Sequence, residues 1–271
     1  AMLDFLRLRA IKDVEFVSDT SYIRTIRLGQ FTGWVQVSHH PQRNALRVEF
    51  THTLTPVLPA LLQRLRNLFD LSARPDLIAD HLQQDPLLHA SLSLNPGLRV
   101  AGAFDGFEMA IRAILGQQIT VKAATTIGGR FAAAFGEPFA TPFAELTRLS
   151  PLASRISTAS VDDIASLGIV SARSRCILAM AQASASGELR LEAGSEPEKV
   201  IAQLVALPGI GPWTANYIAM RALRWPDAFP KEDIAVRNNL GGVSAKQAEA
   251  MSQAWRPWRS YAVMHIWKNM S

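Results

Sequence analysis

The sequence predicts an α+β protein, in which a small N-terminal α/β domain with an antiparallel sheet precedes a mostly helical core. Leu46, Val48 and Phe50 alternate with charged residues, which is the period of a half-buried strand. From about residue 76 onward, apolar residues follow helical spacing instead. Two of the expected helices meet at the turn Pro-Gly-Ile-Gly at 208–211. Strands followed by a run of helices indicate an α+β fold.

Composition places the chain among globular proteins and narrows its chemistry. The 271 residues are 48% hydrophobic, and 28 Lys and Arg against 23 Asp and Glu give a net charge of +5. A mildly basic chain of this length permits a nucleic-acid partner. The single cysteine, Cys176, excludes an internal disulfide and a four-cysteine iron–sulfur cluster. No signal-peptide core and no membrane-spanning apolar run is present, so we expect a cytoplasmic protein without a membrane partner.

The N-terminal part is expected to contain strands between residues 10 and about 52. Phe31–Val37 is one candidate strand, and Gly29-Gln30 before it is a candidate turn. Thr55-Pro56 then opens a predicted helix. Its expected apolar face consists of Leu58, Leu61, Leu62, Leu65 and Leu68. The sequence of this part indicates no chemistry.

The middle of the chain contains two predicted helical pairs. Phe107–Leu115 has one apolar helical face that ends at Gly116-Gln117-Gln118, and a second helix follows from about Thr120. A polar tip of this kind is most often a solvated turn. Ser166–Ile169 echoes Leu207–Ile210, so we expect a second helix–turn–helix there.

The turn at 208–211 is the first candidate site. Before it, Ser195 and Glu198 have the spacing of a capping box, which predicts the start of a helix. Gly209 ends that helix, and Gly211 followed by Pro212 begins the next. Glycines let a ligand approach the backbone, and N–H groups at a helix start favour an anion. A plain packing corner between two helices explains the same residues.

Asp233 is the second candidate. It precedes a predicted helix at 234–239, where an aspartate caps the first turn and favours the helix dipole. A carboxylate held by helix N–H groups also stays ionised and suits catalysis. Trp213 and Tyr217 are four residues apart, so they share one helical face nearby.

The C-terminal end is rich in aromatic residues, with Trp255, Trp258, Tyr261 and Trp267 at helical spacing. Such clusters are more often core than site. Ser244 and Gln247 form another candidate capping box. Arg256 and Arg259 are expected to form a basic flank.

Several of these motifs occur in an order that resembles the helix-hairpin-helix DNA glycosylases, and within them the AlkA-type 3-methyladenine DNA glycosylases II. The resemblance covers nearly the whole chain. It is carried by Ala113–Gln117, Leu207–Tyr217, Asp233, Trp255–Ala262 and His265–Trp267.

The resemblance implies a monofunctional glycosylase of base excision repair. Such an enzyme flips alkylated bases of the 3-methyladenine and 7-methylguanine type out of duplex DNA and hydrolyses the N-glycosidic bond. It implies a monomer that acts on double-stranded DNA at the bacterial nucleoid. The implied domains are residues 1–75 (N-terminal α+β domain), 76–105 with 226–271 (helical lobe carrying Asp233) and 106–225 (helical lobe with the helix-hairpin-helix at about 198–221).

The resemblance also assigns residue roles. Asp233 is the catalytic carboxylate. Trp213, Tyr217, Trp267 and Phe5 belong to the base pocket, although a core role for Phe5 is equally open. DNA binding falls to Gln117, Gln118, Gly209, Gly211 and Thr214. Gln118 stands where the family usually places a bulky apolar side chain that fills the gap left by the flipped base. No cofactor is required, and the carbonyls of Val205, Leu207 and Gly209 are expected to hold Na⁺ or K⁺ that bridges to a DNA phosphate.

Two alternatives remain at this stage. A non-catalytic helix-hairpin-helix DNA-binding module would explain the hairpin, Arg256 and Arg259, but not the set of Asp233, Trp213 and Tyr217. A bifunctional glycosylase/lyase would need a nucleophilic lysine at the hairpin position that Trp213 occupies. Lys231 is near in sequence but does not match that position.

Overall fold

The computed structural model describes residues 2–268, and the chain divides into two compact units. Unit 1 contains residues up to 64 and residues 110–188, and unit 2 contains residues 65–109 and 189–271. The chain passes between the units three times: inside helices α2 (Leu58–Leu68) and α5 (Gly106–Leu115), and between residues 188 and 189. The domain boundaries at 75, 105 and 225 that the resemblance implies remain predictions.

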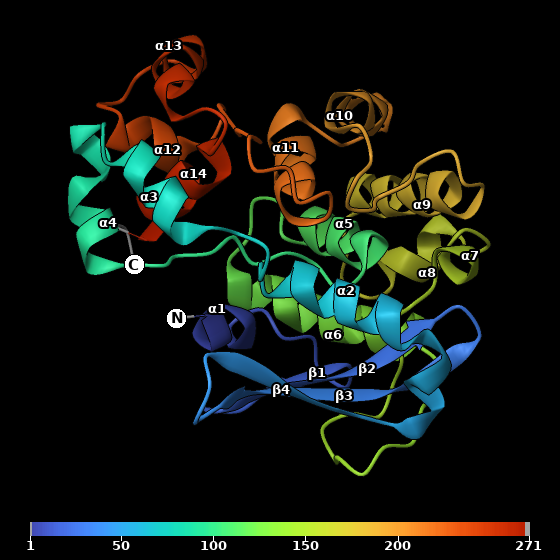
Figure 1. Ribbon diagram of the computed structural model, residues 1–271. Helices are drawn as coiled ribbons and strands as arrows, with labels where there is room; N and C mark the ends of the chain where they lie inside the picture. The colour runs from blue at the N-terminus through green and yellow to red at the C-terminus, as the bar shows by residue number, and fades with distance from the viewer. Residues whose placement is uncertain (1, 269–271) are drawn as a thin grey trace. The chain divides into compact units, whose positions relative to one another are not determined.

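The sheet of unit 1 is a four-stranded antiparallel meander, drawn in blue in Figure 1. Its strands are β1 (Glu15–Val17), β2 (Ser21–Leu28), β3 (Phe31–His40) and β4 (Ala45–Phe50). Leu28 pairs with Phe31, so Gly29 and Gln30 form a two-residue hairpin turn, and the φ of Gly29 is 60°. The predicted antiparallel sheet and the predicted turn are therefore confirmed.

Burial differs between the strands. The residues of β2 are buried along almost its whole length, whereas Leu46, Val48 and Phe50 of β4 are half-buried between exposed neighbours. Glu15 is buried in the sheet and accepts a hydrogen bond from the Tyr22 hydroxyl at 2.5 Å. Arg24 and Arg112 form ion pairs with the same carboxylate, which provides the partners that a buried charge needs.

Helices complete unit 1. They are α1 (Met2–Arg7), η1 (His52–Val57), α6 (Val121–Phe135), α7 (Ala153–Ile156), α8 (Val161–Ala165) and α9 (Ser171–Ala185). Helices α8 and α9 form the predicted second helix–turn–helix, and Gly168 between them has a φ of 86°. The apolar face predicted for α2 is right at Leu61 and Leu65 but wrong at Leu62, whose side chain is 41% exposed.

Unit 2 is helical. Its elements are α3 (Pro75–Leu82), η2 (Pro86–Leu88), α4 (His89–Leu94), α10 (Pro197–Ala206), α11 (Pro212–Arg221), α12 (Ile234–Asn239), α13 (Ala245–Met251), η3 (Ser252–Trp255) and α14 (Arg259–Lys268). The capping box of Ser244 and Gln247 is confirmed at the start of α13. The one predicted for Ser195 and Glu198 is wrong. Pro197 opens α10, so the N-cap is Glu196, and Ser195 donates to the Arg190 carbonyl instead.

Two further features concern the described part of the chain as a whole. No helix within residues 2–268 is long and apolar enough to cross a membrane. Nor does this part contain a group of three or more His, Cys, Asp and Glu side chains that could hold a metal ion.

Candidate active site

The hairpin of unit 2 joins α10 to α11 through a tight turn, as predicted; both helices are orange in Figure 1. Gly209 has a φ of 83°, a left-handed conformation that favours glycine. Gly211 is the N-cap of α11 with ordinary angles (φ −89°, ψ 170°), and Pro212 follows as the first helical residue. No side-chain hydrogen bond caps α11 at Gly211. The first N–H groups of such a helix favour an anion.

Asp233 lies at the start of α12 and is only 9% exposed. Its Oδ1 accepts from the Val236 amide at 2.8 Å and from the Trp267 indole at 3.2 Å, while Oδ2 accepts from the Trp213 indole at 2.7 Å. These bonds use three of the roughly four acceptor directions of a carboxylate. The side chain is therefore fixed in place, and Oδ2 keeps capacity for one more partner, such as a water or a sugar. The cap of α12 uses only one of these acceptor directions.

The two indoles that bind this carboxylate belong to a cluster of three aromatic rings. Trp213 and Tyr217 stack, with ring centroids 5.3 Å apart and planes inclined by 10°. Tyr217 and Trp267 lie at 6.2 Å and 56°. Helical spacing brings the first two together on α11, and α14 supplies the third. The structure thus brings Asp233 together with three of the aromatic residues that the sequence analysis named.

Arg221 is a residue of this site that the sequence analysis missed. It lies one turn after Tyr217 on α11, is 5% exposed, and donates to the Tyr217 hydroxyl at 2.7 Å. The same guanidinium also donates to the carbonyls of Ala101 and Gly102. The spacing of Arg221 from Tyr217 was a usable signal, but its carbonyl partners lie about 120 residues earlier and leave no local pattern.

The remaining predicted residues of unit 2 lie around the hairpin. Val205 and Leu207 are at the C-terminal end of α10, where carbonyls carry the negative end of the helix dipole and suit a cation. Thr214 is 4% exposed. These roles stay predictions.

Other predicted residues lie in unit 1. Gln118 is exposed at the tip between α5 and α6, and the Gln117 carbonyl accepts a hydrogen bond from Arg173 at 2.6 Å. Phe5 is half-buried in α1, and the Arg9 guanidinium lies 3.9 Å from its ring centroid. The roles of Gln117 and Gln118 in DNA binding, and of Phe5 in the base pocket, also remain predictions.

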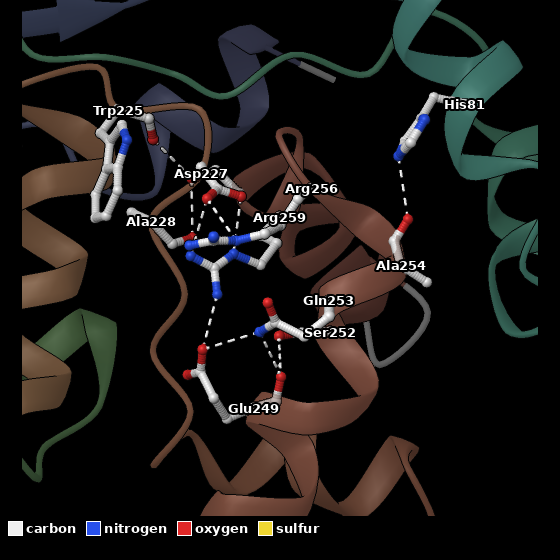
Figure 2. Close-up of polar contacts among 11 residues, drawn as sticks. His81, Trp225, Asp227, Ala228, Glu249, Ser252, Gln253, Ala254, Arg256 and Arg259 are labelled. Atoms are coloured by element: carbon white, nitrogen blue, oxygen red, sulfur yellow. Dashed lines mark hydrogen bonds and ion pairs between the residues drawn. The ribbon is translucent and has the colours of Figure 1, made fainter.

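The predicted basic flank is wrong for Arg259. Figure 2 shows this side chain inside an ionic network: it donates to both oxygens of Asp227 at 2.8 and 2.9 Å and to Glu249 at 2.9 Å. At 4% exposure it holds the fold together. Arg256 pairs with Asp227 at 3.1 Å, and Lys231 lies 4.0 Å from Glu249.

Comparison with known proteins agrees with this geometry. Residues 1–105 match the AlkA N-terminal domain, and residues 111–260 match the HhH-GPD superfamily base excision DNA repair protein. The chain is 34% identical to DNA-3-methyladenine glycosylase 2 of Escherichia coli, covering 98% of this chain and 92% of that protein. It is 38% identical to a probable bifunctional transcriptional activator/DNA repair enzyme AlkA of Mycobacterium tuberculosis, over 96% of this chain.

The chain spans only about half (52%) of that mycobacterial relative. Among solved structures, a 3-methyladenine DNA-glycosylase from Archaeoglobus fulgidus shares the fold, with a TM-score of 0.81 at 18% identity, covering 98% of this chain and 92% of that one. The family match includes the hairpin, the stacked aromatic pair and Asp233. The chain therefore belongs to the HhH-GPD superfamily of base excision DNA repair proteins, with an AlkA N-terminal domain in front of it.

Proposed function

We propose that this protein is a monofunctional DNA glycosylase. It takes alkylated bases of the 3-methyladenine and 7-methylguanine type out of double-stranded DNA and hydrolyses the N-glycosidic bond, which leaves an abasic site. One observation carries the proposal: the Asp233 carboxylate is held by two indole N–H groups beside a stacked aromatic pair. A DNA-binding module without catalysis would use this carboxylate as the cap of α12, which accounts for the Val236 amide but not for the two indole donors.

The carboxylate suits the chemistry of glycosidic cleavage. Loss of the base develops positive charge on the sugar, as in oxocarbenium-like glycoside hydrolysis. A fixed anion beside C1′ stabilises that charge electrostatically, and it can also orient or deprotonate the attacking water. Oδ2 of Asp233 has the remaining acceptor capacity for either task.

The aromatic rings suit a cationic leaving group. Trp213 and Trp267 direct their indole N–H groups to Asp233 and lie in one aromatic cluster with Tyr217. An electron-rich face attracts an alkylated, positively charged purine through cation–π interaction. Such a base already leaves readily, so the site needs no strong general acid.

The hairpin and the α5–α6 tip supply contacts to DNA under this proposal. The N-terminus of α11 at Gly211 binds a backbone phosphate, which positions the enzyme without reading sequence. Na⁺ or K⁺ at the carbonyls of Val205, Leu207 and Gly209 would add positive charge beside that phosphate. Gln118 enters the base stack of the duplex and fills the gap left by the flipped base.

The test is release of free base from methylated duplex DNA, followed by chromatography. We expect the unchanged protein to release methylated purines and Asp233→Asn to do so at least ~100-fold more slowly, the scale of a lost catalytic group. The side-chain NH₂ of Asn would face one of the N–H groups that now donate to Asp233, and two donors cannot bond to each other. The thermal stability of Asp233→Asn is therefore measured alongside its activity. Glu232→Gln is the matched control, because it removes the neighbouring negative charge. Near-normal release by Asp233→Asn would refute the assignment.

The monofunctional assignment depends on Trp213. A lyase needs an amine at C1′ that is neutral enough to attack, and an indole N–H is only a donor. Lys231, the nearby amine in sequence, has its Nζ 4.0 Å from Glu249. The product should therefore be an intact strand that is cut only after alkali. Borohydride trapping measures this directly, and a stoichiometric protein–DNA adduct would identify a lyase.

A further inference from the structure

The tip between α5 and α6 is held by an arginine from another helix of unit 1. Arg173, in the first turn of α9, donates from Nη2 to the carbonyl of Gln117 at 2.6 Å. Its Nε–H is buried without a hydrogen-bond partner within residues 2–268. Buried polar groups are normally paired, and this unpaired Nε–H contributes no hydrogen bond that would fix the side chain. The contact with Gln117 accounts for its position.

The bonded carbonyl lies just beyond the end of α5. The C-terminal end of a helix carries the negative end of its dipole. A guanidinium suits this place, because it offers an N–H donor to the carbonyl and a positive charge near the dipole end. Arg173 therefore stabilises the point at which the chain leaves α5.

The next residue is strained. Gln118 has a φ of 56°, which a residue with a side chain rarely adopts. Its side chain is exposed at the tip. On the far side, Thr120 fixes the chain by capping α6, since its Oγ1 accepts from the Ala123 amide at 3.2 Å. Gln118 is thus held between two anchors, Arg173 on Gln117 and the cap on α6.

We propose that Arg173 is a positioning residue for Gln118: it holds the tip in the left-handed conformation that projects the side chain of Gln118 into duplex DNA. This inference rests on the proposed function, because it assigns Arg173 to the step that opens the duplex. Arg173 itself touches neither the base nor the sugar in this role. Its effect should therefore depend on the presence of a second strand.

The experiment compares excision of a methylated base from duplex and from single-stranded DNA. Arg173→Met removes the donor and should lower the duplex-to-single-strand ratio of rates roughly fivefold, in the range expected for one lost hydrogen bond. Arg173→Lys keeps a donor and a charge, so it should recover part of the ratio. Arg175→Met is the matched control: it removes the same charge from an exposed position on the same helix. An equal loss on both substrates would overturn the proposal.

A double-mutant cycle isolates the connection. In a Gln118→Ala background, Arg173→Met should change the ratio little further, because the side chain to be positioned is gone. Hydrogen exchange should be faster at residues 116–119 in Arg173→Met than in the unchanged protein. Additive losses in the cycle would refute the inference while leaving the glycosylase proposal intact. Absence of base release by the unchanged protein would instead refute the proposed function.

Discussion

Trp213 and Trp267 each perform two tasks with different parts of one side chain. The indole N–H holds an oxygen of Asp233, and the ring is part of an aromatic cluster with Tyr217. The carboxylate and the aromatic cluster are therefore mechanically coupled. Arg221 extends the coupling, because it donates a hydrogen bond to the Tyr217 hydroxyl. Replacing either indole by an aliphatic side chain should change both the orientation of the carboxylate and the packing of the aromatic cluster.

Trp267→Phe separates the two tasks, since it removes the N–H and keeps an aromatic ring. A hydrogen bond to a charged group contributes about 1.5–3 kcal/mol, so excision should fall roughly tenfold or more if the bond orients Asp233 for reaction. DNA affinity should hardly change. Trp258→Phe is a matched control, because Trp258 packs edge-on against Tyr261 in the same unit. Single-turnover excision and binding are measured for both variants, and a loss confined to binding would contradict this role.

Elements with strong local signals were predictable from the sequence. The period-two pattern around Val48, the turn at Gly29 and the helix after Asp233 all appear as expected, because each depends on neighbouring residues. The capping box at Ser195 failed for a local reason too: Pro197 fixes the helix start one position later. By contrast, the position of Leu62 depends on what its helix packs against, which no local pattern records.

The two glycines of the hairpin should respond differently to replacement. Gly209 needs its left-handed conformation, so Gly209→Ala strains the turn itself. Gly211 has ordinary angles, and a Cβ built there meets nothing within 4 Å, so Gly211→Ala should leave stability unchanged or slightly raised. If a phosphate approaches this backbone closely, Gly211→Ala weakens duplex binding about tenfold and for all sequences alike. Affinity across a salt series and unfolding midpoints measure both effects. Unchanged affinity in Gly211→Ala would exclude close approach at this glycine.

Across the whole chain, buried charges pair with partners distant in sequence. Asp70 is 1% exposed, pairs with Arg224 and accepts from the Tyr261 hydroxyl at 2.9 Å, across separations of 154 and 191 residues. Burial raises the pKa of Asp70, and Arg224 opposes that rise. Arg259 belongs to a network of the same kind. The net charge of +5 therefore does not indicate which arginines are exposed. The sequence could not show this either, because the partners of the buried arginines lie far away in the chain.

His265 should make the stability of the protein sensitive to acid. Its side chain is 3% exposed, and burial lowers its pKa from 6.5 to about 4, with a hydrogen bond to Ser91 partly offsetting the change. Between these pH values the unfolded chain binds a proton that the folded chain does not. Proton binding by the unfolded chain therefore has no effect on stability above pH ~6.5. As the pH falls from ~6.5 toward 4, it lowers the free energy of unfolding by about 3 kcal/mol.

Denaturant unfolding from pH 7.5 to 4 measures this term by comparing the protein with His265→Gln. The variant loses the packing and the hydrogen bond of His265 at every pH, so it should be less stable at pH 7.5. It lacks the proton-linked loss, however, so the stability difference between the two proteins should shrink as the pH falls. His52→Gln, at an exposed histidine, is the matched control for the loss of one imidazole. If the stability difference between the protein and His265→Gln stays constant with pH, burial does not lower the pKa of His265 in the folded protein, and the prediction is wrong.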